Sequence, residues 1–205
     1  KNLLYQIDTL KKKQRLKIFG KKRKTFKVMK TCLYSPYFPK HVGGGEKYFL
    51  DVARALSRYG DVSLAIPNDQ PDSSEKIYDR YEKFLGKSIE DFSLIKSPLG
   101  SSASFIKKLL WTRQFDLLYS FTDGSLFPSF AKKNILHIQT PLKREPASFI
   151  EKCKIASWSF INTNSEFTKN VVEKFWKIKV NAVHHPMVDV LEIENLQKTI
   201  KKEKV

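Results

Sequence analysis

The chain has 205 residues, of which 41% are hydrophobic and 13% aromatic, so it can bury a core and is neither disordered nor fibrous. Its 38 Lys and Arg residues outnumber 21 Asp and Glu residues, giving a formal net charge of +17; taken alone, this charge favours a nucleic acid or an anionic membrane as partner. No apolar run approaches the roughly 18–20 residues that a membrane span needs. Cys32 and Cys153 are too few for a disulfide framework or a zinc site, which favours a reducing compartment.

The positive charge is concentrated at the N-terminus. Residues 1–30 contain twelve of the basic residues and a single acidic residue, Asp8, so this segment carries +11 and the remaining 175 residues carry +6. Like charges at this density favour a solvated tail or an exposed helix over a packed element. We therefore expect residues 1–27 to form a basic arm or linker, and residues 1–26 to be able to meet an anionic membrane surface.

From Lys30 onward the pattern alternates between strands and helices. Short apolar runs predict buried strands, and apolar residues three and four apart predict helices with one buried face. The predicted strands are Thr31–Ser35, Val62–Ile66, Phe92–Ile95, Leu117–Phe121, Ile135–Gln139, Trp158–Asn162 and Val180–His184. The predicted helices are Glu46–Tyr59, Glu75–Leu85, Phe105–Trp111, segments near Leu126–Ala131 and Ala147–Ile155, and Ser165–Trp176.

This alternation predicts the fold class. It is typical of an α/β protein with a Rossmann-like, doubly wound and mostly parallel sheet of about six or seven strands. One such domain spans residues 28–190, and the Lys/Glu-rich residues 191–205 are expected to be a charged tail or interdomain linker. Ligands of these sheets bind at the carboxyl ends of the strands, so the candidate site residues are those in the loops at that edge.

The clearest candidate is the run Gly43, Gly44, Gly45 and Glu46 at the start of the first predicted helix. Glycines let the backbone approach a ligand closely, and the free N–H groups and dipole of a helix start favour an anion. The run matches neither G-x-G-x-x-G nor the Gly-Lys-Ser/Thr of a P-loop, which disfavours NAD and P-loop nucleotides. A tight turn without a ligand is the alternative interpretation.

A second candidate is the strand end that begins at His137. Side chains alternate along a strand, so His137 and Gln139 are expected to point to the same side. Thr140, Lys143 and Arg144 follow, and together this set could hold a sugar hydroxyl or a phosphate. A buried structural histidine is the alternative for His137.

Two further polar segments have simpler explanations. Asn164 and Ser165 precede a helix that contains Lys169, and ordinary helix capping accounts for most of this pattern. His184 and His185 are adjacent, so on a strand they face opposite ways, and no acidic third ligand lies nearby. We therefore predict no metal site.

Five segments of the chain resemble the N-terminal domain of the family 4 glycosyltransferases of the GT-B fold. In order along residues 28–190 they read K-T-C-L-Y-S-P-Y-F-P-K-H-V-G-G-G-E-K-Y, L-L-Y-S-F-T-D-G, I-L-H-I-Q-T-P-L-K-R, I-N-T-N-S-E-F-T-K and V-H-H-P-M-V-D. The resemblance implies that this domain is one half of a GT-B fold. It also implies transfer of a sugar from a nucleotide–sugar donor to an acceptor hydroxyl, usually with retention and without a metal.

The resemblance assigns roles to the candidate residues. It implies that Gly43–Glu46 faces the donor diphosphate, and that His137 or Gln139 is the catalytic candidate, since related sequences often carry histidine at the position of Gln139. The acceptor side is implied to consist of Ser120, Thr122, Asp123, Gln139, Thr140 and Arg144. The other cleft residues are Asn164, Ser165 and Lys169.

The leading hypothesis is therefore the acceptor-side domain of a hexosyl-type glycosyltransferase of polysaccharide biosynthesis. It would use a glycan or lipid-linked acceptor, act in the cytoplasm or peripherally at a membrane, and need no cofactor, because the nucleotide–sugar is a substrate. The family's donor-site glutamate pair belongs to a second domain absent from this chain, so the fragment is expected to be inactive alone. Glu82 and Glu90 have the spacing of that pair but are expected to be surface acids.

Two other functions remain in view. The main alternative is a non-enzymatic basic module that binds nucleic acid or an anionic membrane on an α/β scaffold. A small-molecule enzyme on a related sheet is a third option, because fold alone does not fix function. Most of the charge lies in the arm outside the domain, so a nucleic-acid partner is less favoured.

Overall fold

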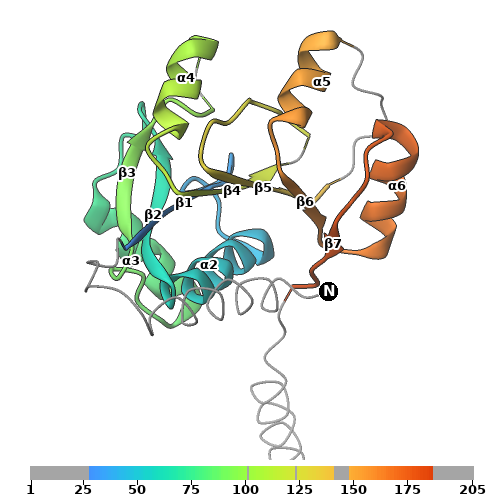
Figure 1. The fold of residues 1–205 in the computed structure, drawn as a ribbon. Helices are drawn as coiled ribbons and strands as arrows, with labels where there is room; N and C mark the ends of the chain where they lie inside the picture. Colours follow the sequence, from blue (N-terminus) through green and yellow to red (C-terminus); the bar gives the residue numbers. More distant parts are fainter. Residues whose placement is uncertain (1–27, 101, 123, 141–147, 187–205) are drawn as a thin grey trace, which may run out of the picture.

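The computed structural model describes residues 28–100, 102–122, 124–140 and 148–186, which form one seven-stranded sheet (Figure 1). The strand order is β3-β2-β1-β4-β5-β6-β7, and every neighbouring pair is parallel. This confirms the predicted α/β fold with a Rossmann-like, doubly wound sheet. The predicted arm of residues 1–27 and the tail of residues 191–205 lie outside the described residues.

The elements follow the alternation of the sequence. The strands are β1 (Met29–Tyr34), β2 (Gly60–Pro67), β3 (Ser93–Ser97), β4 (Leu117–Thr122), β5 (Lys133–Ile138), β6 (Phe160–Thr163) and β7 (Ala182–Val183). The helices are α2 (Gly44–Ser57), α3 (Ser74–Leu85), α4 (Phe105–Thr112), α5 (Phe149–Ala156) and α6 (Glu166–Trp176). The strand order reverses between β1 and β4, which is the point in such sheets where ligand clefts open.

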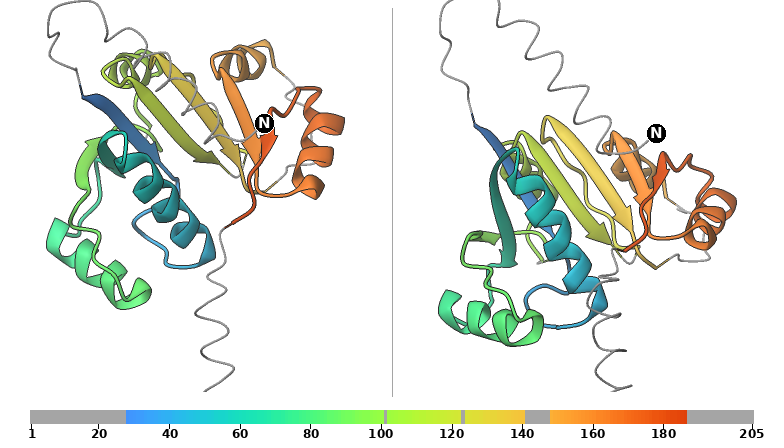
Figure 2. Two further views of the ribbon diagram at one scale, coloured as in Figure 1. Left: turned by 60° about the horizontal axis from the view of Figure 1, so that its bottom comes forward. Right: turned by 90° about the horizontal axis from the view of Figure 1, so that it is seen from below.

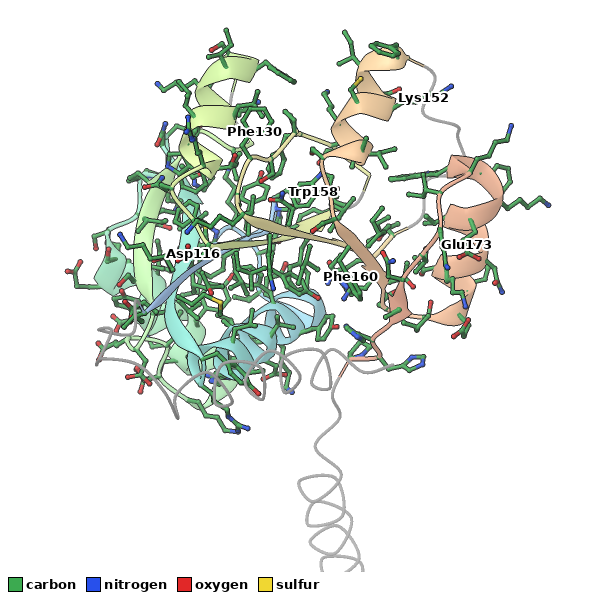
Figure 3. The ribbon with its side chains drawn as sticks, viewed as in Figure 1. Asp116, Phe130, Lys152, Trp158, Phe160 and Glu173 are labelled. Atoms are coloured by element: carbon green, nitrogen blue, oxygen red, sulfur yellow. The ribbon has the colours of Figure 1, made fainter. Side chains whose placement is uncertain are left out.

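The helix predicted near Leu126–Ala131 is wrong, because the structure has an irregular connection between β4 and β5 there. Its backbone N–H groups bind side chains of neighbouring elements instead of helical carbonyls. Ser129 N donates to Ser157 Oγ at 3.1 Å, and Phe130 N donates to Thr112 Oγ1 at 2.9 Å. Phe130 consequently lies close to the base of α4 (Figure 3).

Helices cover both faces of the sheet (Figures 1 and 2), and a hydrophobic core lies on each face. On one face, α2 and α3 cover a core that includes Leu33, Phe49 and Phe121, all almost fully buried. On the other face, α4, α5 and α6 lie over a core built around Cys32 and Leu118. Consecutive residues of β1 therefore serve opposite faces, as the period of a strand requires.

Two general features bear on function. None of the helices in the described part of the chain is long and apolar enough to cross a membrane. Glu82 and Glu90 are exposed, which confirms that they are surface acids.

Candidate functional site

Gln139 lies at the carboxyl edge of the sheet and contacts several neighbouring elements there. Its backbone N–H donates to Thr122 O at 3.1 Å, which ties it to the end of β4. Its carbonyl accepts from Asn164 Nδ2 at 3.0 Å, which ties it to the end of β6. Its side-chain amide lies against the first turn of α2, 3.5 Å from where a Cβ on Gly45 would stand. Gln139, which directly follows β5, is therefore held by three neighbouring elements, and it is half-buried.

The loop that leads into α2 is held from below by α3. Arg80 Nη1 donates to Pro39 O at 2.9 Å, and the Tyr81 hydroxyl donates to His41 O at 2.5 Å. The backbone of the loop is therefore fixed before it reaches the glycines. A fixed loop can present the first N–H groups of α2 in one orientation, which an anion site requires.

The glycines at the start of α2 have different surroundings. A Cβ on Gly45 would stand in ordinary van der Waals contact with the Gln139 amide, 3.5 Å away, so a side chain larger than alanine would press on this amide. A Cβ on Gly44 would have nothing within 4 Å, and Gly44 is exposed. No packing contact thus requires glycine at position 44, and this residue has the free space that a ligand would need.

Glu46 changes the electrostatics of this helix start, and the sequence reasoning did not foresee how. The residue is buried, at 7% exposure, and its Oε2 lies 3.4 Å from where a Cβ on Gly43 would stand. The carboxylate is therefore folded back over the first turn of α2, where the helix dipole stabilises it. A bound anion would have to share this end of the helix with Glu46. The signal for this arrangement was an acid three residues after the helix cap.

The predicted residues of β4, Ser120 and Thr122, are both buried. The Oγ1 atom of Thr122 donates to Ser125 O at 2.6 Å and accepts from Gly124 N at 3.0 Å, so this side chain shapes the turn after the strand. Ser120 is 0% exposed, and its hydroxyl donates to Phe121 O at 3.5 Å. Both side chains are therefore buried, and Thr122 stabilises the turn that follows β4.

The predicted cleft residues at the start of α6 mainly build the helix cap. Ser165 Oγ accepts from Thr168 N at 3.1 Å, and Asn164 Oδ1 accepts from Thr168 Oγ1 at 2.8 Å. Lys169 forms an ion pair with Glu166 at 3.2 Å. Of these residues, Asn164 has the direct link to the site, because its amide holds the Gln139 carbonyl.

His137 lies in the core beneath the site. It is 0% exposed and packs against the rings of Tyr48 and Phe121, with ring centroids 5.0 and 4.8 Å away. It projects to the α2 side of the sheet, the side on which Gln139 also meets α2, as strand alternation predicts. Burial lowers the pKa of His137 to about 3. The imidazole is therefore neutral at ordinary pH, and Gln139 is the one of the two candidates that reaches the sheet edge.

A buried hydrogen-bond network surrounds His137, and Asn162 is its centre. Asn162 Oδ1 lies 3.2 Å from His137 Nδ1, while Asn162 Nδ2 lies 2.9 Å from the Tyr119 hydroxyl and 2.8 Å from His184 Nδ1. The Tyr119 hydroxyl is also hydrogen-bonded to Tyr48. The Tyr48 hydroxyl then donates to His184 O at 3.2 Å and closes the network.

The network fixes the tautomers of both histidines. Because Asn162 Oδ1 only accepts, His137 carries its proton on Nδ1; because Asn162 Nδ2 only donates, His184 carries its proton on Nε2. The Nε2 atoms of both rings are buried without a hydrogen-bond partner. Burial lowers the pKa of His184 as well, which keeps both rings neutral.

Acid is expected to destabilise the protein through His137. The unfolded chain takes up a proton near the ordinary pKa of 6.5, whereas the folded chain resists protonation down to about 3. Stability is therefore fully present above pH 6.5 and falls as the pH drops below it, by up to about 1.4 kcal/mol per pH unit. Urea unfolding between about pH 7 and pH 5 measures the slope. His137→Gln should flatten it, and a variant at the exposed His41, His41→Gln, should not; an unchanged slope in His137→Gln would contradict the assignment.

The remaining predicted residues complete the picture. Thr140 is exposed beside Gln139, whereas Asp123 and Arg144 lie outside the described residues. Among the described residues, no three His, Cys, Asp or Glu side chains gather in a way that could hold a metal ion. A surface hollow of about 440 Å³ lies between α5 and α6, lined by Lys152, Ile155, Ala156, Phe175, Trp176, Lys177 and Ile178. Its walls include none of the predicted site residues.

The sequence pointed to neither Tyr48 nor Tyr119 as members of the buried network, and it raised Asn162 and His184 only as a polar strand end and as a metal candidate. One feature could have indicated the network: His137 and Asn162 are paired in register on neighbouring strands, so their side chains lie side by side. That register becomes known only once the strands are paired. Comparison with known proteins adds no further assignment, because no protein-family model, curated protein or solved structure matches this chain.

Proposed function

We propose that the chain is the acceptor-side domain of a hexosyl-type glycosyltransferase that uses a nucleotide–sugar donor. The proposal rests on the hydrogen bonds of Gln139 to the ends of β4 and β6 and on its contact with the start of α2. These contacts lie at the carboxyl edge of the sheet, beside the point where the strand order reverses. The resemblance of the five sequence segments supplies the reaction class.

The residues at this edge suit the two halves of such a reaction. The exposed first turn of α2 at Gly44 offers backbone N–H groups for the diphosphate of the donor. The Gln139 amide can donate to and accept from a sugar hydroxyl, and exposed Thr140 adds a second hydroxyl contact. The donor nucleotide itself would be held by a second domain, so this chain alone would orient substrates without transferring sugar.

The proposed reaction exchanges one bond at the anomeric carbon of the donor sugar. The acceptor oxygen bonds to this carbon, the bond from the carbon to the diphosphate oxygen breaks, and its electron pair leaves on the diphosphate. The hydroxyl proton of the acceptor passes to the departing diphosphate. The N–H groups at the start of α2 would stabilise the charge that develops there, which is electrostatic catalysis.

Removing the charge of Glu46 is expected to strengthen binding of the diphosphate. Glu46→Gln takes a carboxylate away from the first turn of α2, so the affinity for a nucleoside diphosphate should rise about three- to fivefold. Titration monitored by amide chemical shifts measures it. Glu75→Gln removes an equivalent first-turn acid from α3 and should change nothing. Unchanged affinity in Glu46→Gln would place the anion elsewhere.

The proposal is tested by titrating the whole chain with UDP-glucose, GDP-mannose and pyrophosphate in separate experiments. Amide shifts are expected at Gly43–Gly45, Gln139 and Thr140, and they should survive moderate salt. The alternative, a basic module for polyanions, predicts instead that a DNA duplex or anionic vesicles bind while these amides stay unchanged. Such binding would weaken steeply with salt because it releases counterions. That second outcome would overturn the proposal.

A further inference from the structure

Helices α4 and α5 are unusual in how little of them is buried. In α4 the only buried residue is Thr112, and in α5 it is Ile155, whereas α2 buries six residues. Both short helices lie on the same side of the sheet, and their first turns form the ends farthest from it (Figure 1). They therefore stand out from the domain as two projections.

The outer ends of the two projections carry the same apolar pair. Each helix begins with a serine cap, followed by Phe and Ile: Phe105 and Ile106 in α4, Phe149 and Ile150 in α5. The exposed fractions of these four side chains are 49%, 67%, 81% and 61%. Leu110, one turn further along α4, is also exposed. Aromatic and aliphatic residues at a first turn do nothing for the helix, where polar or acidic residues are favoured.

The charges around these apolar pairs are positive. Lys107 and Lys108 follow the pair in α4, and Lys152 and Lys154 follow the pair in α5; Figure 3 marks Lys152 beside the outer half of α5. The single acid of the two helices, Glu151, is turned back into its own cap, where its Oε2 accepts from Ser148 N at 3.3 Å. An approaching surface would therefore meet apolar tips surrounded by lysines.

We propose that the tips of α4 and α5 insert into the interface of an anionic lipid bilayer. Short projections with an apolar end and a basic rim suit a fluid surface that closes around each tip and carries negative headgroups. A second copy of the chain fits less well, because two separate convex tips do not offer the roughly 800 Å² of packed surface per partner that a stable dimer needs. This surface is distinct from residues 1–26 and does not depend on sugar transfer.

The test uses the whole chain with vesicles of phosphatidylglycerol and phosphatidylcholine in equal parts, and with phosphatidylcholine alone. Co-sedimentation should show binding that favours the anionic vesicles. Phe149→Ser/Ile150→Ser and Phe105→Ser/Ile106→Ser should each weaken this binding about tenfold. Phe84→Ser removes an exposed phenylalanine from α3, on the opposite face of the sheet, and should leave binding unchanged.

The depth to which a side chain enters the bilayer distinguishes insertion of these tips from purely electrostatic binding through residues 1–26. Phe149→Trp should be quenched by lipids brominated on their acyl chains, and Phe84→Trp should not. At about 0.5 M salt, where charge attraction is screened, the difference between the wild type and the serine variants should persist. Equal vesicle binding of all variants, or an unquenched Phe149→Trp, would overturn the proposal. So would a dimer in sedimentation velocity that the serine variants abolish while vesicle binding stays intact.

Discussion

Replacing Asn162 with alanine is expected to lower the free energy of unfolding by about 3 kcal/mol. The amide of Asn162 joins His137, Tyr119 and His184 in the core beneath the candidate site. Without it, the N–H of His137 and the Nδ1 atom of His184 lose their partners, and water has no access to His137, which is 0% exposed. Urea unfolding at neutral pH measures the loss. It is a large part of the roughly 5–15 kcal/mol that stabilises an ordinary domain.

Two further variants distinguish the network from a general effect of losing a polar side chain. Asn68→Ala removes an exposed asparagine from the loop after β2 and should change the stability by less than about 0.5 kcal/mol. Tyr119→Phe removes only the hydroxyl and should cost about 1 kcal/mol. Because Asn162 and Tyr119 share a hydrogen bond, the double variant should lose less than the sum of the two losses. An Asn162→Ala variant as stable as Asn68→Ala would show that the network does not stabilise the fold.

The sequence predicted the fold well because its main signals are local. Each strand is a short apolar run, and each long helix repeats apolar residues on one face, as Phe49, Ala53 and Leu56 do in α2. The helix predicted around Phe130 does not form, because backbone groups of this segment hydrogen-bond to side chains of α4 and β5. What decided the structure there was the hydrogen bonding of Ser129 N to Ser157 and of Phe130 N to Thr112, and these partners lie 28 and 18 residues away in the chain.

The candidate site was predictable in position but not in detail. Parallel topology brings Gly45, Gln139 and Asn164 to one edge, and each was named from the sequence. Which side chains face a ligand depends on distances that a sequence does not contain. The burial of Ser120 and the folding back of Glu46 over α2 both follow from packing between elements. The same holds for the contrast between Gly44 and Gly45.

A bulky residue at position 44 is expected to abolish binding of the diphosphate while leaving the fold intact. A Cβ at Gly44 would meet nothing within 4 Å and the residue is exposed, so we expect Gly44→Leu to fit without disturbing the fold. Gly44 is the first residue of α2, where helix propensity has less weight than in the interior, so the variant should be about as stable as the wild type. Its side chain would cover the first N–H groups of α2, and the affinity for UDP-glucose, GDP-mannose or pyrophosphate should fall at least about tenfold.

Substitutions of increasing size at Gly44 and Gly45 test whether the loss of diphosphate affinity is specific to position 44. Gly44→Ala should lose part of the affinity, and Gly44→Leu should lose most of it, with urea unfolding unchanged or improved in both. Gly45→Leu would instead press on the Gln139 amide and should disturb the site and the stability together. Ser102→Leu adds the same bulk at an exposed loop position and should affect neither. If stable Gly44 variants still bind the diphosphate with the affinity of the wild type, the exposed start of α2 holds no ligand.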